Sequence, residues 1–575
     1  MDWDQPIRRR TLLKVAGVGV ATYLVNGCSA TGTPTSTPAP ASTTGSAPTP
    51  AVGSGAPVAP KRVSAVRMAA IRAQGLFEPP NAFGSNTGPA GQQTSYLFDS
   101  LVQRDSTTEP LPWLAEKWTL SPDGTEWTFT LREGVRFHDG ETLTADDVEF
   151  SFQYLASHPA GQLYTTAPQV VKEAKALDPR TVRITLKDPF APFLNNVASS
   201  MPIFPKHIWA GIADPMKFND PKAFIGSGPY TLAAINAADS SMLFVANDDF
   251  FLGKPYVQRI EFIPVGDDLL ALKAGQLDVA APTATTGLTN DVLAPFRSDP
   301  KYVVLEAHGE GTTALHFNLS KGAPYDDVAF RRAVVFAIDR QQLVSRFLTD
   351  NGEIGSPGFL PTANPYSTKE VEQYPYDPQR AKTLLDQAGY REQGGQRTRP
   401  DGSPLTVMLM FGAPSARVAE FLRGQLAQVG IQVELRSVDQ GTANQLQAAG
   451  NYELSLVTYG GLGSDPDFMR RAFGSPDQAQ FWYKAWGYHS AEFDQLAGQQ
   501  LRAFDDQRRH SLVQQMQRIV SQDVPIMPLF YPTRYVIYVL AVFDGWYFTP
   551  LSNPLAMNKH FFVTGQKTGL AIRQK

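Results

Sequence analysis

Few side chains in this 575-residue chain have the type and spacing that could catalyse a reaction. Cys28 is the single cysteine, and no serine lies in the Gly-x-Ser-x-Gly turn that exposes a hydrolase nucleophile. The eight histidines are scattered, and no two of them are four residues apart as on a metal-binding helix. We therefore expect no enzyme, no resident metal and no cofactor, which leaves binding as the chemistry of the chain.

Aromatic side chains are the first candidates for binding. Trp482, Tyr483 and Trp486 form a cluster in a polar, loop-like stretch of the sequence. Rings of this kind line the walls of small-molecule sites. The same rings could instead pack one loop onto the protein, and the pattern leaves both interpretations open.

The N-terminal residues resemble an export address. Residues 8–28 begin with arginines, continue with a short apolar run that is too glycine-rich to span a bilayer, and end at Cys28. Arg9–Lys14 resembles a twin-arginine motif, and Val25–Cys28 resembles a lipobox with an unusual Asn26. We expect residues 1–28 to direct export and Cys28 to be lipidated; the alternative is a plain Sec signal or an uncleaved anchor.

Composition separates a tether from a folded part. Residues 29–60 consist almost wholly of Ser, Thr, Ala, Gly and Pro, which predicts a disordered linker. The whole chain is 42% hydrophobic and 11% aromatic, as in globular proteins. Its net charge of -4 gives no general attraction to nucleic acid, which we exclude as a partner.

The folded part shows alternating strand and helix signals, which predict a mixed α/β protein. Residues 118–120 and 126–132 alternate around a turn and predict a hairpin. Thr144 and Asp147 form a capping box before a helix, and helices are also predicted after Asp327, after Asp377 and over 512–520. In the loop Phe137–Gly140 we expect a structural His138 with Asp139 capping backbone groups, and in Gly226–Tyr230 a turn with positive φ and close backbone approach.

A long series of segments resembles the bacterial extracellular solute-binding proteins of the peptide and nickel type, called family 5. The series begins at Leu114–Trp118 and continues through the predicted hairpin to Gly134–Gly140 and Leu143–Val148. Later segments that resemble the family are Pro205–His207, Gly226–Tyr230, Leu272–Asp278, Asp326–Arg340 and Val524–Leu529. The resemblance extends over nearly all of residues 63–535.

The resemblance implies a periplasmic-binding-protein-like clamshell with two lobes and a hinge. Lobe I would comprise residues 61–307, with an extra subdomain at about 97–200, and would be completed by residues 524–575. Lobe II would comprise residues 308–523. Such a protein captures a small molecule, here oligopeptides or peptide-like solutes, and delivers it to an ABC permease and ATPase complex. We expect a monomer, held outside the cytoplasm on the membrane face by its lipid anchor.

The ligand contacts implied by the resemblance come mainly from lobe II. Leu456–Asp467 corresponds to the strand and loop that meet the ligand in the family, and within it we select Tyr459, Gly460, Asp465 and Asp467. Either aspartate could pair with a ligand ammonium, or both could cap an Asp-Pro turn. Leu462 stands where dipeptide binders usually carry an acidic residue. The remaining expected contacts are Trp482, Tyr483, Trp486, Asn318, Phe77 and Tyr96.

Other functions remain open at this point. A receptor for a nickel chelate or a glycoside is the alternative within the same class. Nickel members of the family place histidines on a captured chelate, so His316 or His489 could serve, although we favour surface positions for both. An anchored hydrolase of cell-wall peptides is the alternative from another class, and turnover of a peptide library would reveal it.

Overall fold

The computed structural model describes the chain in part. Lys61–Lys575 forms one compact unit. The described residues are 62–70, 80, 83, 88–104, 110–158, 166–280, 287–308, 311–462, 465–476, 485–546, 559 and 563. Cys28 and the 29–60 linker lie outside them. Within these ranges no helix is both long enough and apolar enough to cross a membrane.

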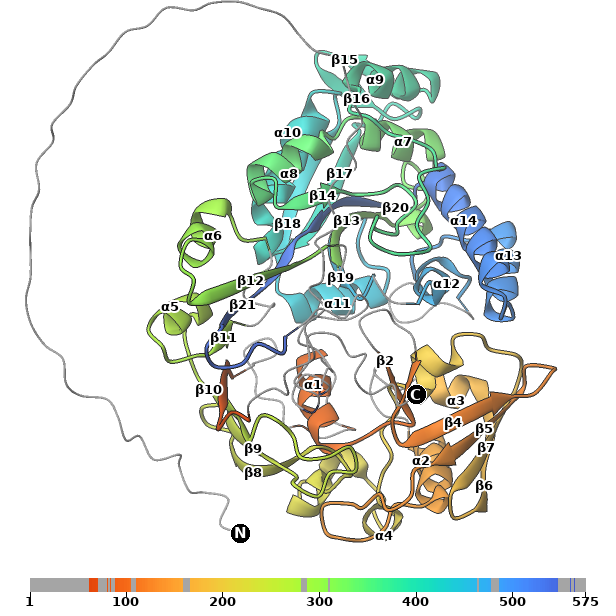
Figure 1. The fold of residues 1–575 in the computed structure, drawn as a ribbon. Coiled ribbons are helices and arrows are strands. Elements are labelled where there is room, and N and C mark those ends of the chain that lie inside the picture. Colours follow the sequence, from red (N-terminus) through yellow and green to blue (C-terminus); the bar gives the residue numbers. More distant parts are fainter. Residues whose placement is uncertain are drawn as a thin grey trace, which may run out of the picture. The chain divides into compact units, whose positions relative to one another are not determined.

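A large mixed sheet organises the middle of the chain (Figure 1). Its strands run in the spatial order β14 (Gly352–Ile354), β20 (Ile526–Pro532), β13 (Gly311–Phe317), β19 (Leu454–Gly460), β17 (Thr406–Gly412), β18 (Gln432–Val438). β13 is antiparallel to both β19 and β20, whereas β17 is parallel to β18 and β19. We call this sheet and its helices lobe II.

Helices cover both faces of the large sheet. Neighbouring residues on each strand point to opposite faces, so Leu315 of β13 belongs to one core and Ala314 to the other. The first core is formed with α7 (Val328–Phe336), α8 (Arg340–Leu348), α9 (Pro378–Gln387) and α10 (Ala416–Ala427). The second is formed with α11 (Gln440–Ala448), α12 (Asp467–Phe473), α13 (Ala491–Leu501) and α14 (Asp506–Asp523).

The predicted helix boundaries in lobe II are confirmed. The Asp327 side chain accepts the Ala329 amide at 2.9 Å at the start of α7. Asp377 caps α9 in the same way through the Arg380 amide, at 2.8 Å. Each short carboxylate satisfies a backbone donor that the helix itself cannot use.

Two further sheets belong to what we call lobe I. One runs in the order β1 (Val66–Ala69), β10 (Arg259–Ile263), β9 (Ser241–Ala246), β8 (Tyr230–Asn236), and the other β11 (Val279–Ala280), β21 (Arg534–Val539), β12 (Tyr302–Ala307). The helices of this lobe include α1 (Gly88–Leu97), α4 (Lys206–Trp209), α5 (Asp268–Lys273) and α6 (Asn290–Arg297). Leu293 and Phe296 of α6 share a core with Tyr535 and Ile537 of β21.

A fourth sheet forms a subdomain of lobe I. Its strand order is β4 (Ala115–Leu120), β5 (Glu126–Leu131), β7 (Thr181–Leu186), β6 (Val171–Asp178), and α2 (Ala145–Ser157) and α3 (Thr166–Val170) lie beside it. Trp118 pairs with Phe129, so the predicted hairpin is confirmed. The capping box is confirmed as well, because the Thr144 amide donates to the Asp147 carboxylate at 2.9 Å.

Short elements complete the described chain. The small ladders pair β2 (Val102–Arg104) with β3 (Pro110–Pro112) and β15 (Arg391–Gln393) with β16 (Gln396–Thr398). The single-turn helices are the π-helix η2 (Leu194–Ala198) and the 3-10 helices η3 (Pro215–Lys217), η4 (Pro221–Phe224), η5 (Leu319–Lys321) and η6 (Ala413–Ser415).

The described chain passes between the lobes at two neighbouring places. β12 of lobe I leads to β13 of lobe II, and β20 of lobe II leads through Thr533 to β21 of lobe I. His308 and Thr533 join the two crossings, with 3.2 Å between Nδ1 and Oγ1. We expected the return to lobe I at about residue 524. Ile526–Pro532 instead pairs with β13 and β14, so the return comes at Thr533.

The Gly226–Tyr230 segment has one of the two features that we expected, close backbone approach, and lacks the other, positive φ. Gly226 and Gly228 do not have positive φ, so that part of the prediction is wrong. The close approach is confirmed, since a Cβ on Gly226 would lie 2.1 Å from the Leu97 carbonyl oxygen and one on Gly228 would lie 2.2 Å from that of Tyr96. His138 holds the segment with both ring nitrogens: the Gly226 amide donates to Nδ1 at 3.2 Å, and Nε2 is 2.9 Å from the Gly228 carbonyl.

Candidate functional site

The ends of β13 and β19 lie beside the crossings between the lobes. Gly311 and Gly460 are register partners at this end of the two strands. Arg534, the first residue of β21, reaches the same place, with Nη2 3.9 Å from where a Cβ of Gly460 would lie. Tyr459 and Gly460, both selected from the sequence, therefore lie where the chain passes from lobe II to lobe I.

Tyr459 and Trp486 meet at a buried histidine. The Tyr459 hydroxyl shares a hydrogen bond with Nε2 of His316, and the His316 ring lies 5.3 Å from the Tyr459 ring and 5.8 Å from the Trp486 ring. Burial lowers the pKa of His316 to about 3 and keeps the imidazole neutral. The surface position expected for His316 is wrong, because β13 is covered on both faces. The surface position expected for His489 is confirmed, because its side chain is 63% exposed.

The two selected aspartates are held in a buried network. Arg509 donates to both oxygens of Asp465, at 2.6 and 2.9 Å. Arg470 donates to both oxygens of Asp467, at 2.6 and 2.9 Å, and Gln500 connects the two pairs. Burial alone raises the pKa of Asp467, but Arg470 and its neighbours outweigh that effect and hold it below the ordinary value. Both carboxylates are thus neutralised within lobe II.

The sequence Asp465-Pro466-Asp467 left two roles open, capping of an Asp-Pro turn and pairing with a ligand ammonium, and the observed contacts include the first. The Asp467 amide donates to Oδ1 of Asp465 at 2.9 Å, as in an Asp-Pro turn. The cationic partners come from within lobe II. Contact of either aspartate with a ligand ammonium stays a prediction. Arg509 lies on α14 and Arg470 on α12, and sequence spacing could indicate only the second, because Asp467 and Arg470 are three residues apart on one helix.

Asn318 has its partners within lobe II, and Tyr96 has its partners within lobe I. The Asn318 amide donates to the carbonyls of Gly450 and Tyr452 at 2.9 and 2.7 Å, and its oxygen accepts the Ser320 amide. The side chain is fully buried within lobe II. Tyr96 is buried against the rings of Tyr230 and Phe244, at 5.9 and 5.5 Å. Their contact with a ligand stays a prediction, as does that of Trp486, which is buried in the second core.

Three selected residues, Phe77, Trp482 and Tyr483, lie outside the described residues. Leu462, which stands in place of an acidic residue, is buried in the second core, and its carbonyl accepts the Asn364 amide at 2.8 Å. The described strand β19 and the turn after it therefore present no acidic side chain at this position.

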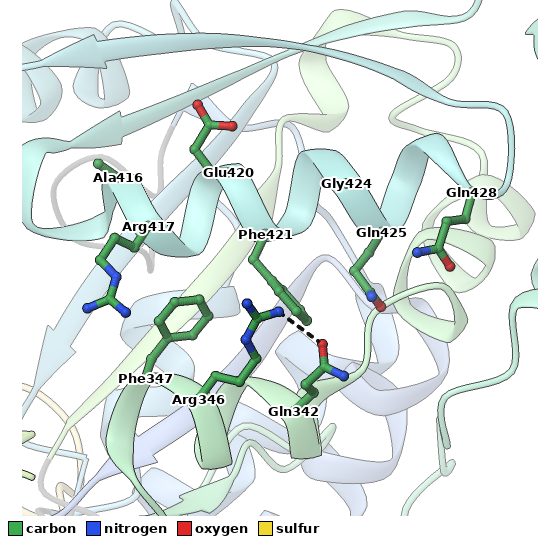
Figure 2. A pocket seen from close by; sticks show the side chains of 10 residues that line it. All are labelled: Gln342, Arg346, Phe347, Ala416, Arg417, Glu420, Phe421, Gly424, Gln425 and Gln428. Carbon is green, nitrogen blue, oxygen red and sulfur yellow. Dashed lines mark hydrogen bonds between the residues drawn. The ribbon is translucent and has the colours of Figure 1, made fainter.

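A surface hollow of about 660 Å³ lies between α8 and α10 (Figure 2). Arg346 stacks on the Phe421 ring at 5.6 Å and Arg417 stacks on the Phe347 ring at 5.2 Å, while the two rings meet edge to face at 5.8 Å. The residues selected from the sequence do not line it. Arginines and phenylalanines spaced along these two helices were the sequence signal for it, and we did not use that signal.

Metal-binding chemistry has little support in the described ranges. Within them no group of three or more His, Cys, Asp and Glu side chains is placed to hold a metal ion. The site as described is a set of buried aromatic and ion-paired side chains beside a double crossing between two lobes. Such an arrangement can recognise and enclose a molecule, and it offers no activated nucleophile among these residues.

Comparison with known proteins identifies the family. Residues 109–481 match the bacterial extracellular solute-binding proteins, family 5 Middle. The nickel-binding periplasmic protein of Escherichia coli (strain K12) is 27% identical over 455 residues, which cover 77% of this chain and 85% of that protein. Di/tripeptide-binding protein 2 of Pseudomonas aeruginosa is 28% identical over 480 residues, covering 78% of this chain and 87% of that protein.

Solved structures share the fold. The oligopeptide-binding protein AppA of Bacillus subtilis, in complex with a nonapeptide, has a TM-score of 0.71 at 21% identity and covers 87% of this chain and 99% of its own. NikA of Brucella suis, in complex with Fe(III)-EDTA, has a TM-score of 0.71 at 23% identity, with 86% and 99% covered. The mixed α/β fold expected from the sequence is thereby confirmed. The chain belongs to family 5 of the bacterial extracellular solute-binding proteins.

Proposed function

We propose that this protein is the extracytoplasmic receptor of an ABC importer, which encloses a solute between lobe I and lobe II and delivers it unchanged to a permease and ATPase complex. The observation that carries the proposal is the pair of neighbouring crossings bridged by His308 and Thr533. Two lobes with separate cores, joined by two adjacent strand connections, can rotate about those connections while each core stays packed. Ligand that touches both lobes then favours the closed arrangement.

For the ligand we propose oligopeptides or peptide-like solutes. Relatives that bind di- and tripeptides match the chain over most of their length, although a nickel-binding relative matches it equally well. Leu462 is buried and apolar, and Asp465 and Asp467 are already paired with arginines. A free α-ammonium therefore lacks a partner at these positions, which argues for longer peptides or blocked peptide-like molecules over ordinary dipeptides.

For the contacts we propose Tyr459 and Gly460 at the crossing, with Trp482, Tyr483 and Phe77 as apolar walls. Asp465, Asp467, Trp486, Asn318 and Tyr96 stay predicted contacts, and their partners within their own lobes would also let them fix the elements around the ligand. Peptide binding through backbone groups and roomy pockets would make the receptor tolerant of side-chain identity.

The N-terminal residues supply the proposed attachment. Residues 1–28 would direct export, Cys28 would carry the lipid, and residues 29–60 would let a monomeric receptor move over the membrane face by roughly 5 to 6 Å times the square root of the linker length. Mass spectrometry of the N-terminal peptide from membranes tests this directly. We expect a diacylated Cys28, and a free thiol on a membrane-released protein would contradict it.

Co-purification tests the transport function. The full-length protein is isolated from its native host, and the molecules released on denaturation are identified by mass spectrometry. We expect peptides, which should raise the melting temperature when added back, because ligand stabilises by RT ln(1 + [L]/Kd). Deleting the gene should abolish uptake of the same peptides. Recovery of a nickel chelate or a glycoside would contradict the peptide proposal, and unimpaired uptake would contradict the import proposal.

A further inference from the structure

Lobe I touches lobe II at a third place, apart from the two crossings. The Ala191 amide of the lobe I subdomain donates to the carbonyl of Leu501, the last residue of α13, at 2.6 Å. Next to this bond, Arg502 Nη2 lies 3.5 Å from Asp188 Oδ1. Figure 1 shows the end of α13 and the strands β4, β5 and β7 on the side of the molecule away from β12 and β21.

Phe504 extends the same contact to the β4–β5 hairpin. A Cβ on Gly124 would lie 2.6 Å from Cε2 of Phe504 and 3.3 Å from Pro189. Gly124 has φ +75 and ends the hairpin turn, so a side chain there would both strain the backbone and displace the ring. Phe504 is 41% exposed, which is high for a large apolar ring and consistent with a contact that can open.

Both sides of this contact are firmly built. The turn carrying Gly124 is fixed by Asp123, which accepts from the Ser121 hydroxyl at 2.5 Å and from the Thr125 hydroxyl at 2.8 Å. On the other side, Asp505 caps α14 through the Arg508 amide at 2.7 Å. Phe493 of α13 and Leu512 of α14 are buried in the second core of lobe II. The contact thus joins two rigid surfaces, and it persists only while the lobes are together.

We propose that these residues form a clasp, comprising Gly124, Asp188, Pro189 and Ala191 on lobe I and Leu501, Arg502 and Phe504 on lobe II, which stabilises the closed arrangement independently of the ligand. The inference rests on the proposed binding function in one respect, namely that closure encloses a ligand. The apparent dissociation constant equals the intrinsic constant divided by the closed fraction, so weakening the clasp raises it for every ligand by one factor. The clasp sets overall affinity and leaves the choice between ligands to the enclosed residues.

Phe504→Ala tests the clasp, with Tyr376→Ala as the matched control. Tyr376 is an aromatic residue of lobe II that is equally 41% exposed and lies outside the clasp. The full chain carrying Cys28→Ser receives spin labels at Lys172→Cys in the subdomain and Arg391→Cys in lobe II, both exposed positions. We expect Phe504→Ala to move the distance distribution of the ligand-free protein toward longer values, and Tyr376→Ala to leave it unchanged. Equal distributions in the two variants would overturn the proposal.

The distance experiment needs no ligand, so it separates failure of the clasp from failure of the proposed function. Affinity is measured with two longer peptides of different composition, pentaalanine and pentalysine, as probes. Where they bind, Phe504→Ala should weaken both by the same factor, about tenfold, and a change in their ratio would place Phe504 among specificity residues and overturn the proposal.

Discussion

Lys559 is buried in lobe I against Asp99, 460 residues earlier in the chain. The ammonium donates to the Asp99 carboxylate and, at 2.8 Å, to the Phe98 carbonyl. Asp99 also accepts the Trp113 indole N–H at 2.7 Å and the Ser227 hydroxyl at 2.8 Å. Burial lowers the pKa of Lys559, while Asp99 raises it in part. The Asp99 carboxylate thus accepts from donors in three separate segments.

Lys559→Met should destabilise the protein by about 3 to 5 kcal/mol, because it leaves the Asp99 charge buried with only neutral donors. Denaturant unfolding followed by intrinsic fluorescence measures the loss. Asp99→Asn/Lys559→Met should lose less than the sum of the single variants, since neither charge is then unpaired. The control Lys217→Ala removes an ion pair with Asp214 whose lysine is 85% exposed, and should leave the free energy of unfolding almost unchanged. Equal losses of stability in the Lys559 and Lys217 variants would show that the buried pair stabilises the protein no more than an exposed pair.

Gly226→Ala should destabilise lobe I by about 3 kcal/mol or more, because its Cβ would lie 2.1 Å from the Leu97 carbonyl oxygen. The effect concerns space and not backbone conformation, since φ at this position is not positive. Gly211→Ala is the matched control, as a Cβ there meets nothing within 4 Å. Thermal unfolding should separate the two variants by several degrees, and similar melting temperatures would refute the steric account.

Local features of the fold could be predicted from the sequence because their causes are local. The β4–β5 hairpin follows from period-two alternation around a turn, and the starts of α7 and α9 follow from Asp327 and Asp377, which bond to backbone amides within three residues. The wider resemblance gave the fold class. The position of the return crossing was misplaced, because nothing within Ile526–Pro532 indicates which sheet that strand joins.

The candidate site could be predicted only in part, because burial and pairing there depend on distant residues. Arg509 is 44 residues from Asp465, so no local pattern indicates that this carboxylate is neutralised. His316 lies on a strand whose two faces are both covered, which requires knowledge of the helices packed on each side. Tyr459 and Gly460 lie together at the end of β19, which requires no information from distant residues because they are neighbours in the sequence.

Asp465→Asn should lower stability in the absence of ligand, by about 2 to 4 kcal/mol, because it leaves the Arg509 guanidinium buried without its charge partner. Burial alone lowers the pKa of Arg509, but Asp465 outweighs that effect and holds the pKa above its ordinary value. Calorimetric unfolding of the ligand-free protein checks the loss. An unchanged melting temperature together with weaker ligand binding would instead identify Asp465 as a ligand contact. Asp249→Asn, at an exposed carboxylate outside the clasp, is a control for the chemical change itself.

Stability should decline in mild acid because His316 is neutral when folded. Burial lowers its pKa to about 3 in the folded protein, whereas an unfolded histidine has a pKa of about 6.5. Between these values the unfolded chain binds more protons, so the free energy of unfolding falls by up to about 1.4 kcal/mol for each pH unit below ~6.5 and is unaffected by this group above that value. Burial lowers the pKa of His138 too, which adds a slope of the same sign.

Replacing the His316 imidazole should remove its contribution to the pH dependence of the free energy of unfolding. In His316→Phe, and in His316→Gln as a second variant that can still bond to Tyr459, urea unfolding between pH 4 and pH 8 should show a shallower dependence than in the parent protein. His489→Gln changes an exposed histidine and should keep the parent slope. A parent slope that survives in both His316 variants would mean that the ring is already protonated in the folded state. The bond to Tyr459 would then join a cation to a hydroxyl, and the stacking of Tyr459 and Trp486 on His316 would gain a cation–π component instead of resting on burial alone.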